Sequence, residues 1–214
     1  MATAGCVDRD ALLRGVQAIR DQGFEVEVSA QIFDSKGYLA GDERNRANEL
    51  INFFQRSDIS AILCARGGFG SAQLLPYLIH SNFQPAPKIF AGYSDVTFLL
   101  NWINSRFGMV TFHAPMVAME LARGLNGRTQ EGFWGLLAGA KSEWEIKLGE
   151  VIRTGKAEGE MMGGCLSVLV TTLGTPYEIQ TEGKLLFLED VGERPYRIER
   201  MLTHLKMAGK LDHL

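Results

Sequence analysis

The chain has 214 residues, of which 46% are hydrophobic and 22% charged, the balance of an ordinary soluble globular protein with one large or two small domains. Its formal net charge is −3 without a run of lysine or arginine, which argues against nucleic acid or an anionic membrane as a partner. No apolar run approaches the ~20 residues that span a bilayer, and the start lacks the features of a secretory signal, so we expect a cytoplasmic protein.

The first elements alternate between helix and strand. Residues 8–22 have the apolar spacing of a helix, with Asp8 as its cap and Gly23 after its end, and residues 23–28 alternate like a strand. This order is typical of an α/β layer, in which a strand normally precedes the first helix. Only residues 1–5 stand before this helix, so we expect the first strand to be trimmed.

A glycine-rich turn follows the next strand. Residues 42–56 have an amphipathic helical pattern, residues 59–64 a buried strand, and residues 72–78 a helix. Between the last two, residues 66–71 read RGGFGS, and such a turn lets backbone N–H groups approach an anion closely. It matches neither the phosphate loop nor the dinucleotide fingerprint. It is therefore either a plain tight turn or a backbone donor for an oxyanion or a substrate carboxylate.

Residues 87–103 place a strand directly before a helix. Residues 88–92 are a short apolar run, and the apolar positions 96, 99, 100 and 103 mark one helix face. Such a turn exposes Ser94 at the carboxyl end of the sheet, as in a nucleophile elbow, although Val96 replaces the second glycine of G-x-S-x-G. Ser94 is thus either a nucleophile or simply the helix N-cap, because serine is a favoured cap.

The pattern of apolar residues and glycines changes in the last third of the sequence. A strand at residues 109–112 ends at His113, and residues 117–138 look helical with an interruption near Gly124 and Gly127. Glycines then divide short runs, which places a domain boundary near residues 140–145. The elements expected after it are strands at 144–146, 151–153 and 155–162, a helix at 166–173 opened by residues 163–165, a strand at 184–188 and a helix at 198–208.

A serine nucleophile needs a base and a residue that orients it. His113, at a strand end on the same sheet edge as Ser94, is the best local base, although a histidine there can equally be structural. Glu189 ends an apolar strand and could orient an imidazole as the third member of a triad does. Asp190 and Glu193 are the carboxylates most easily confused with it. The residues alone therefore indicate a serine hydrolase with an incomplete triad.

The other histidines and the cysteines carry no predicted chemistry. His80 and His204 are expected on the surface. Cys6, Cys64 and Cys165 are widely spaced and odd in number, so we expect reduced, buried thiols. No metal or other cofactor is predicted.

Three segments together resemble one family. Residues 65–71 (ARGGFGS), 92–97 (GYSDVT) and 187–198 (FLEDVGERPYRI) resemble the LD-carboxypeptidases, the muramoyl-tetrapeptide carboxypeptidases, which are relatives of the microcin-immunity peptidases. The resemblance covers nearly the whole chain, and the motifs occur in the family's order. Further similar stretches are residues 37–41, 111–116 and 174–176.

The resemblance implies a fold and a site. It implies a flavodoxin-like parallel-sheet domain at residues 1–142 and a smaller, β-rich α+β domain, incomplete here, at residues 143–214. It also implies a metal-free Ser-Glu-His triad in which Ser94 is the nucleophile and Glu189 orients the histidine. The backbone N–H groups of Gly68 and Asp95 would form the oxyanion hole.

The implied reaction removes the terminal D-alanine of a murein tetrapeptide by cutting an L,D bond, in the cytoplasmic recycling of cell-wall fragments. Family members commonly form homodimers. The alternatives are an immunity-type serine peptidase acting on a peptidyl-nucleotide or another acylated amino acid, and a non-catalytic muropeptide-binding protein.

The chain departs from the family pattern at several positions. The family's catalytic histidine follows the final helix in a segment beyond Leu214, and His213 falls too early to be it, so we expect these 214 residues alone to be poorly active or inactive. His113 belongs to a different family motif. Cys165 stands where asparagine is usual, and Ala114 where glycine is usual, which puts a side-chain contact with substrate at position 165 in doubt.

Overall fold

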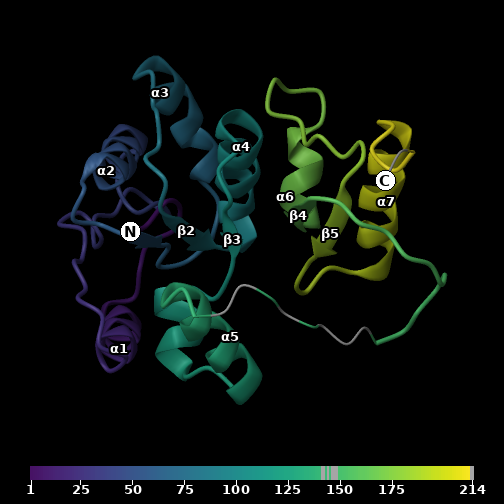
Figure 1. The fold of residues 1–214 in the computed structure, drawn as a ribbon. Coiled ribbons are helices and arrows are strands. Elements are labelled where there is room, and N and C mark those ends of the chain that lie inside the picture. Colours follow the sequence, from purple (N-terminus) through teal and green to yellow (C-terminus); the bar gives the residue numbers. More distant parts are fainter. Residues whose placement is uncertain (141–142, 144, 146–148, 213–214) are drawn as a thin grey trace.

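The computed structural model describes residues 1–214 except 141–142, 144, 146–148 and 213–214. Two groups of elements lie side by side, and the chain passes from one to the other through a stretch in which residues 149–160 form neither helix nor strand (Figure 1). The predicted class, mixed α/β with parallel sheets, is confirmed.

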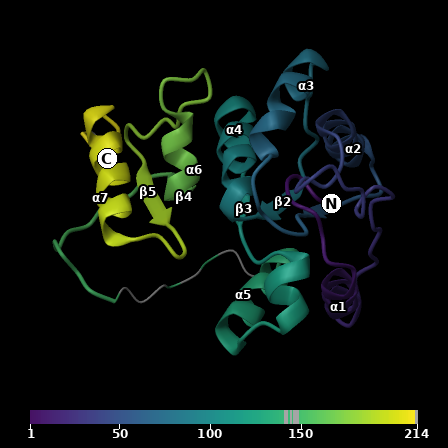
Figure 2. The same cartoon turned by 180° about the vertical axis from the view of Figure 1, so that it is seen from behind.

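The first group is a parallel sheet between two helical layers. The strands are β1 (Ala61–Leu63), β2 (Ile89–Gly92) and β3 (Phe112–His113), in the order β1-β2-β3. Helices α2, α3 and α4 lie on one side of this sheet, and α1 and α5 on the other (Figures 1 and 2). The helices are α1 (Arg9–Arg20), α2 (Glu43–Gln55), α3 (Leu75–His80), α4 (Thr97–Phe107) and α5 (Gly127–Leu137).

Each face of this sheet has its own apolar core. Phe54, Phe90 and Leu99 are completely buried on the side of α2 to α4. Val16 and Phe133 are buried on the side of α1 and α5. Burial of each such side chain contributes roughly 1.5–3 kcal/mol, so the two cores hold the strand ends in fixed positions.

The helix predicted at residues 117–138 is interrupted as expected. A π-helical turn spans Val117–Leu121, and α5 begins at Gly127. The backbone of α1 lies so close to this turn that a Cβ on Gly15 would come within 1.9 Å of the Val117 carbonyl oxygen. Glycine at position 15 therefore allows α1 to reach the sheet.

The strand predicted at residues 23–28 is wrong. Phe24, Val26 and Val28 are half-buried and alternate with exposed residues, as the pattern predicts, but this segment has no assigned strand. Val26, Val28 and Leu63 are among the residues that line one cavity of about 330 Å³, and among the described residues no backbone hydrogen bond joins this segment to β1. Beside β1 lies Met1 instead, whose carbonyl accepts a hydrogen bond from Ala65 N–H at 2.7 Å.

The second group is a pair of parallel strands flanked by two helices. Strand β4 (Met161–Cys165) pairs with β5 (Leu185–Glu189), and α6 (Leu166–Leu169) continues as a 3-10 turn, Val170–Thr172, which confirms the helix predicted at 166–173. The last helix is α7 (Pro195–Met207).

One strand predicted here is wrong and another is wrong in part. Residues 151–153 form no strand, and of residues 155–162 only the last two do. Residues 163–165, predicted to open a helix, instead belong to β4. A Cβ on Gly163 would lie 1.8 Å from the Phe187 carbonyl oxygen, so glycine at this position lets β5 pack closely against β4. Of the strand predicted at 144–146, residues 144 and 146 lie outside those described, and Glu145 is not in a strand. No helix in the described part of the chain is long and apolar enough to cross a membrane.

Candidate active site

Ser94 lies at a strained turn between β2 and α4. Its φ is +59°, and among the described residues only Asn82 is another non-glycine residue with positive φ. This left-handed conformation costs a non-glycine residue roughly 1–2 kcal/mol, and such strain clusters at functional sites. A short 3-10 turn, Ser94–Val96, then leads into α4.

The hypothesis that Ser94 only caps the helix is wrong. The residue in the cap position is Tyr93 for the 3-10 turn and Val96 for α4, and neither cap has a side-chain hydrogen bond. The elbow also tolerates Val96 for a visible reason. A Cβ on Gly92 would lie 3.0 Å from the side chains of both Cys64 and Val96, so a glycine at position 92 gives Val96 room to pack.

Replacing Ser94 by glycine should stabilise the fold. Glycine adopts positive φ without strain, so we expect Ser94→Gly to be about 0.5–1 kcal/mol more stable than Ser94→Ala, which keeps the strain. Urea unfolding measures the difference. The matched control is Ser105→Gly on the exposed face of α4, which should lose about 0.5 kcal/mol because glycine is a poor helix former. Equal stability of the two Ser94 variants would contradict strain at this residue.

The glycine-rich turn packs directly against the elbow. A Cβ on Gly67 would lie 3.0 Å from both Cβ and Oγ of Ser94 and 3.5 Å from Asp95 N. Gly68, the predicted oxyanion donor, is exposed, has a φ of +130° and lies beside Gly5. The family resemblance implies the role of Gly68, which stays a prediction. Gly67 was not singled out, because a run of glycines does not show which one packs against the serine.

Asp95 holds the two loops together. Its Oδ2 accepts a hydrogen bond from Ser71 N–H at 2.7 Å, where a 3-10 turn begins. Its side chain is buried, which raises its pKa. Arg46 fixes the same turn from behind: it is buried and donates to the carbonyl of Gly70 at 3.1 Å and to that of Thr3. The glycine turn is therefore tied both to the elbow and to α2.

Glu189 reaches this edge from the second sheet. It is the last residue of β5 and lies 3.7 Å from His113, measured from Glu189 Oε1 to His113 Nε2. Burial and the neighbouring Asp190 raise the pKa of Glu189, and burial lowers the pKa of His113. Glu189 Oε1 is buried without a hydrogen-bond partner among the described residues. Buried polar atoms are nearly always paired, so an oxygen without a hydrogen bond at this position marks Glu189 as a candidate functional residue.

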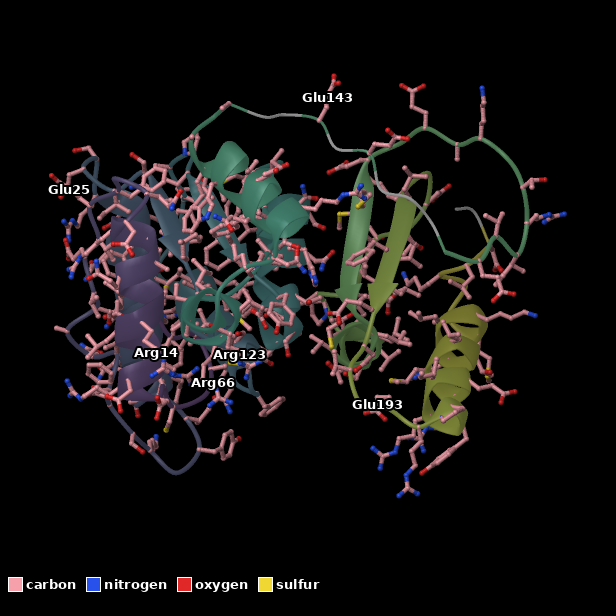
Figure 3. All side chains as sticks on the ribbon, turned by 90° about the horizontal axis from the view of Figure 1, so that it is seen from below. Arg14, Glu25, Arg66, Arg123, Glu143 and Glu193 are labelled. Carbon is pink, nitrogen blue, oxygen red and sulfur yellow. The ribbon has the colours of Figure 1, made fainter. Side chains whose placement is uncertain are left out.

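The two neighbouring carboxylates have partners of their own. Asp190 Oδ2 accepts a hydrogen bond from Ser167 N–H at 2.7 Å, at the start of α6. Glu193 forms an ion pair of 3.4 Å with Arg197 on α7. Figure 3 shows Glu193 and Arg66, the first residue of the glycine-rich turn, at the same end of the molecule. Of these three carboxylates, Glu189 is the one with a buried oxygen that has no hydrogen-bond partner among the described residues, and its role in orienting a histidine stays a prediction.

The predictions for the other histidines and for the cysteines are confirmed in part. His80 and His204 are exposed, as expected, whereas His213 lies outside the described residues. All three cysteines are free; Cys64 and Cys165 are buried as predicted, but Cys6 is partly exposed. Within the described ranges, no three His, Cys, Asp or Glu side chains are grouped as they would be around a metal ion.

Comparison with known proteins identifies the family of the chain. The profile of the LD-carboxypeptidase N-terminal domain matches residues 1–114, and that of the LD-carboxypeptidase C-terminal domain matches residues 158–214. A probable murein peptide carboxypeptidase of Bacillus subtilis is 39% identical over 214 residues, which cover 99% of this chain and 67% of that protein.

Solved structures have the same fold. A muramoyltetrapeptide carboxypeptidase from Oxalobacter formigenes is 28% identical and aligns with a TM-score of 0.84 over 99% of this chain and 71% of that chain. The microcin C7 self immunity protein MccF, in a complex with adenosine monophosphate, is 22% identical and aligns with a TM-score of 0.82 over 100% of this chain and 73% of that chain, a likeness in fold. The chain therefore belongs to the LD-carboxypeptidase family of peptidases.

Proposed function

We propose that this protein is a serine carboxypeptidase that cleaves the L,D bond to the terminal D-alanine of murein tetrapeptides in peptidoglycan recycling. The observation that carries the proposal is the strained Ser94 just after β2, whose Gly92 pairs with His113, while His113 lies 3.7 Å from the buried Oε1 of Glu189. The names of the Bacillus and Oxalobacter relatives support the substrate class.

The proposed chemistry is acyl transfer through Ser94. Its hydroxyl loses a proton to a histidine base and attacks the carbonyl before D-alanine, while the N–H groups of Gly68 and Asp95 donate to the oxyanion. The histidine returns the proton to the leaving amine, and water then hydrolyses the acyl-enzyme. Glu189 orients the imidazole and stabilises its charged form.

The base is the part of the triad that needs a direct test. The family resemblance assigns it to a histidine beyond Leu214, and His113 is the alternative within the 214 residues. The division into domains at residues 1–142 and 143–214, the cytoplasmic location and the homodimer also stay predictions.

A mass-spectrometric assay of D-alanine release tests the function. A murein tetrapeptide is incubated with protein expressed from the complete reading frame and, in parallel, with the 214-residue chain. Release by the longer protein alone supports the proposal and the family's histidine. Release by the shorter chain as well makes His113 the base. Release by neither overturns the proposal in favour of an immunity-type substrate or a muropeptide-binding protein.

Gly67→Ala should impair the site by crowding the nucleophile. The added methyl would lie 3.0 Å from Ser94 Oγ, tighter than most contacts in proteins, so the hydroxyl must shift. Misplacement of a reacting group by 1 Å can lower a rate by about 10²-fold, and we expect kcat/KM to fall by at least about tenfold. Gly127→Ala, where a Cβ meets open space, is the matched control. Equal activity of the two variants would show that Gly67 does not confine Ser94.

A further inference from the structure

Thr97 connects the helix of the nucleophile to the strands that carry Glu189. It is the first residue of α4, three positions after Ser94, and it is completely buried. Its Oγ1 accepts a hydrogen bond of 3.1 Å from the backbone N–H of Cys165. Cys165 in turn is the residue of β4 that pairs in register with Glu189 of β5. A single side-chain hydroxyl therefore lies between the nucleophile's helix and the carboxylate's sheet.

The contact is as close as the backbone allows. Gly164 has a φ of +130°, and a Cβ there would lie 2.6 Å from Thr97 Oγ1. One turn further along α4, Asn101 exchanges two hydrogen bonds with Gly163, from its Nδ2 to the carbonyl at 2.7 Å and from Gly163 N–H to its Oδ1 at 3.2 Å. Two successive turns of α4 thus hold three successive residues of β4.

A second set of contacts, made by His113, connects Glu189 to the strand that precedes Ser94. His113 pairs with Gly92, just before the elbow. Its ring lies edge-on to Phe187, with 5.1 Å between ring centroids, and 3.7 Å from Glu189 Oε1. Phe187 and Glu189 are two residues apart on β5, so both reach His113 from one face of the strand. Glu189 therefore lies between two elements of the first group: β3, which it contacts directly through His113, and α4, to which it is linked through β4.

We propose that Thr97 is a positioning residue for the peptidase reaction: by holding the Cys165 N–H, its hydroxyl sets where Glu189 lies relative to Ser94. This inference rests on the proposed function. It differs from a purely structural role, in which the hydroxyl only satisfies a buried N–H group and its loss lowers stability alone.

The kinetic test separates these two roles. Thr97→Val keeps the size of the side chain and removes the hydroxyl, whereas Thr97→Ser keeps the hydroxyl. We expect Thr97→Val to lower kcat by at least about tenfold with KM within about twofold, as for a lost positioning contact, and Thr97→Ser to restore most of it. Thr171→Val, at an exposed threonine, is the matched control. If Thr97 acts through Glu189, adding Thr97→Val to the Glu189→Gln variant should lower kcat little further. A double variant whose loss of kcat equals the product of the two single losses would overturn the proposal.

A titration tests the inference without any activity. The titratable groups in contact with His113 are Glu189 of β5 and Tyr93, which donates to Glu120 and lies in the field of Arg123. The charged residues that line the same pocket as His113 are Arg128 of α5, Glu145 and Glu160. An ionised carboxylate 3.7 Å away favours the protonated imidazole. NMR of the 214-residue chain should therefore show a lower His113 pKa in Glu189→Gln.

Thr97→Val should shift the His113 pKa in the same direction, by about half a unit or more, and Thr97→Ser should leave it unchanged. An unchanged His113 pKa in Thr97→Val overturns the positioning role, whether or not the protein releases D-alanine. Failure of the wild-type protein to release D-alanine would instead overturn the proposed function, and the titration would still decide the role of Thr97.

Discussion

Replacing Ser94 by alanine should abolish D-alanine release while the fold survives. Alanine keeps the Cβ that packs against Gly67 and the same strained φ, so the change removes only the attacking oxygen. Serine peptidases that lose a triad member lose several orders of magnitude in kcat, and the remainder comes from the oxyanion hole and binding. We expect kcat to fall by at least about 10³-fold, measured by mass spectrometry with enzyme in large excess to detect slow turnover.

The control for this variant is Ser105→Ala, on the exposed face of α4. It also exchanges a hydroxyl for hydrogen, and it should leave the rate unchanged. Circular dichroism and urea unfolding of Ser94→Ala should match the wild-type protein within about 0.5 kcal/mol. Retained D-alanine release by a purified, folded Ser94→Ala protein would remove the serine-peptidase assignment altogether.

The sequence predicted the site where local rules decide the structure. A strand that turns into a helix within three residues must leave Ser94 at the carboxyl end of a parallel sheet. An apolar strand that ends in Glu189 puts its carboxylate at such an edge. Both placements depend on chain geometry over a few residues, and the structure has both residues at strand ends. Their catalytic roles stay predictions.

The errors concern features that long-range packing decides. The pair Gly163–Gly164 looks like a break before a helix, but the approach of the Phe187 carbonyl and of Thr97 keeps both glycines in β4. Residues 23–28 have the alternation of a strand, yet strand pairing needs a partner at hydrogen-bond distance, and among the described residues no backbone hydrogen bond joins them to β1. No pattern within a short window contains this information.

The same limit explains why the supporting contacts of the site were missed. Gly67 and Thr97 are ordinary residues of a glycine run and a helix start. Their importance comes from contacts with Ser94 and with Cys165, which is 68 positions away from Thr97. A single sequence predicts which side chains carry chemistry more readily than which ones hold them in place, because the second depends on how the two sheets meet.

Glu189→Gln should separate catalysis from stability. The amide has nearly the same size but no charge, and it cannot stabilise an imidazolium; the matching change in a serine protease triad lowers kcat by about 10⁴-fold. We expect a loss of similar size in D-alanine release. Glu193→Gln, which removes only an exposed ion pair with Arg197, is the matched control and should keep its rate. Asp190→Asn should weaken the hydrogen bond to Ser167 N–H and affect mainly stability.

The same Glu189→Gln change should not lower the free energy of unfolding, although it lowers activity. Burial raises the pKa of Glu189 above its usual 4.5, so the ionised carboxylate is less favourable in the folded than in the unfolded state. This penalty is fully present above the raised folded pKa and disappears as the pH falls toward 4.5. Glu189→Gln should therefore be at least as stable as the wild type at pH 7, and its advantage should shrink between neutral pH and 4.5.

Thermal unfolding of both proteins across this pH range measures the effect. A carboxylate kept only for structure would give the reverse result, because its replacement would lower stability at neutral pH. A large loss of turnover in Glu189→Gln, together with equal or greater stability, is the combination expected of a residue retained for chemistry. Loss of both would mean that Glu189 holds the two sheets together, and another carboxylate would then have to orient the base.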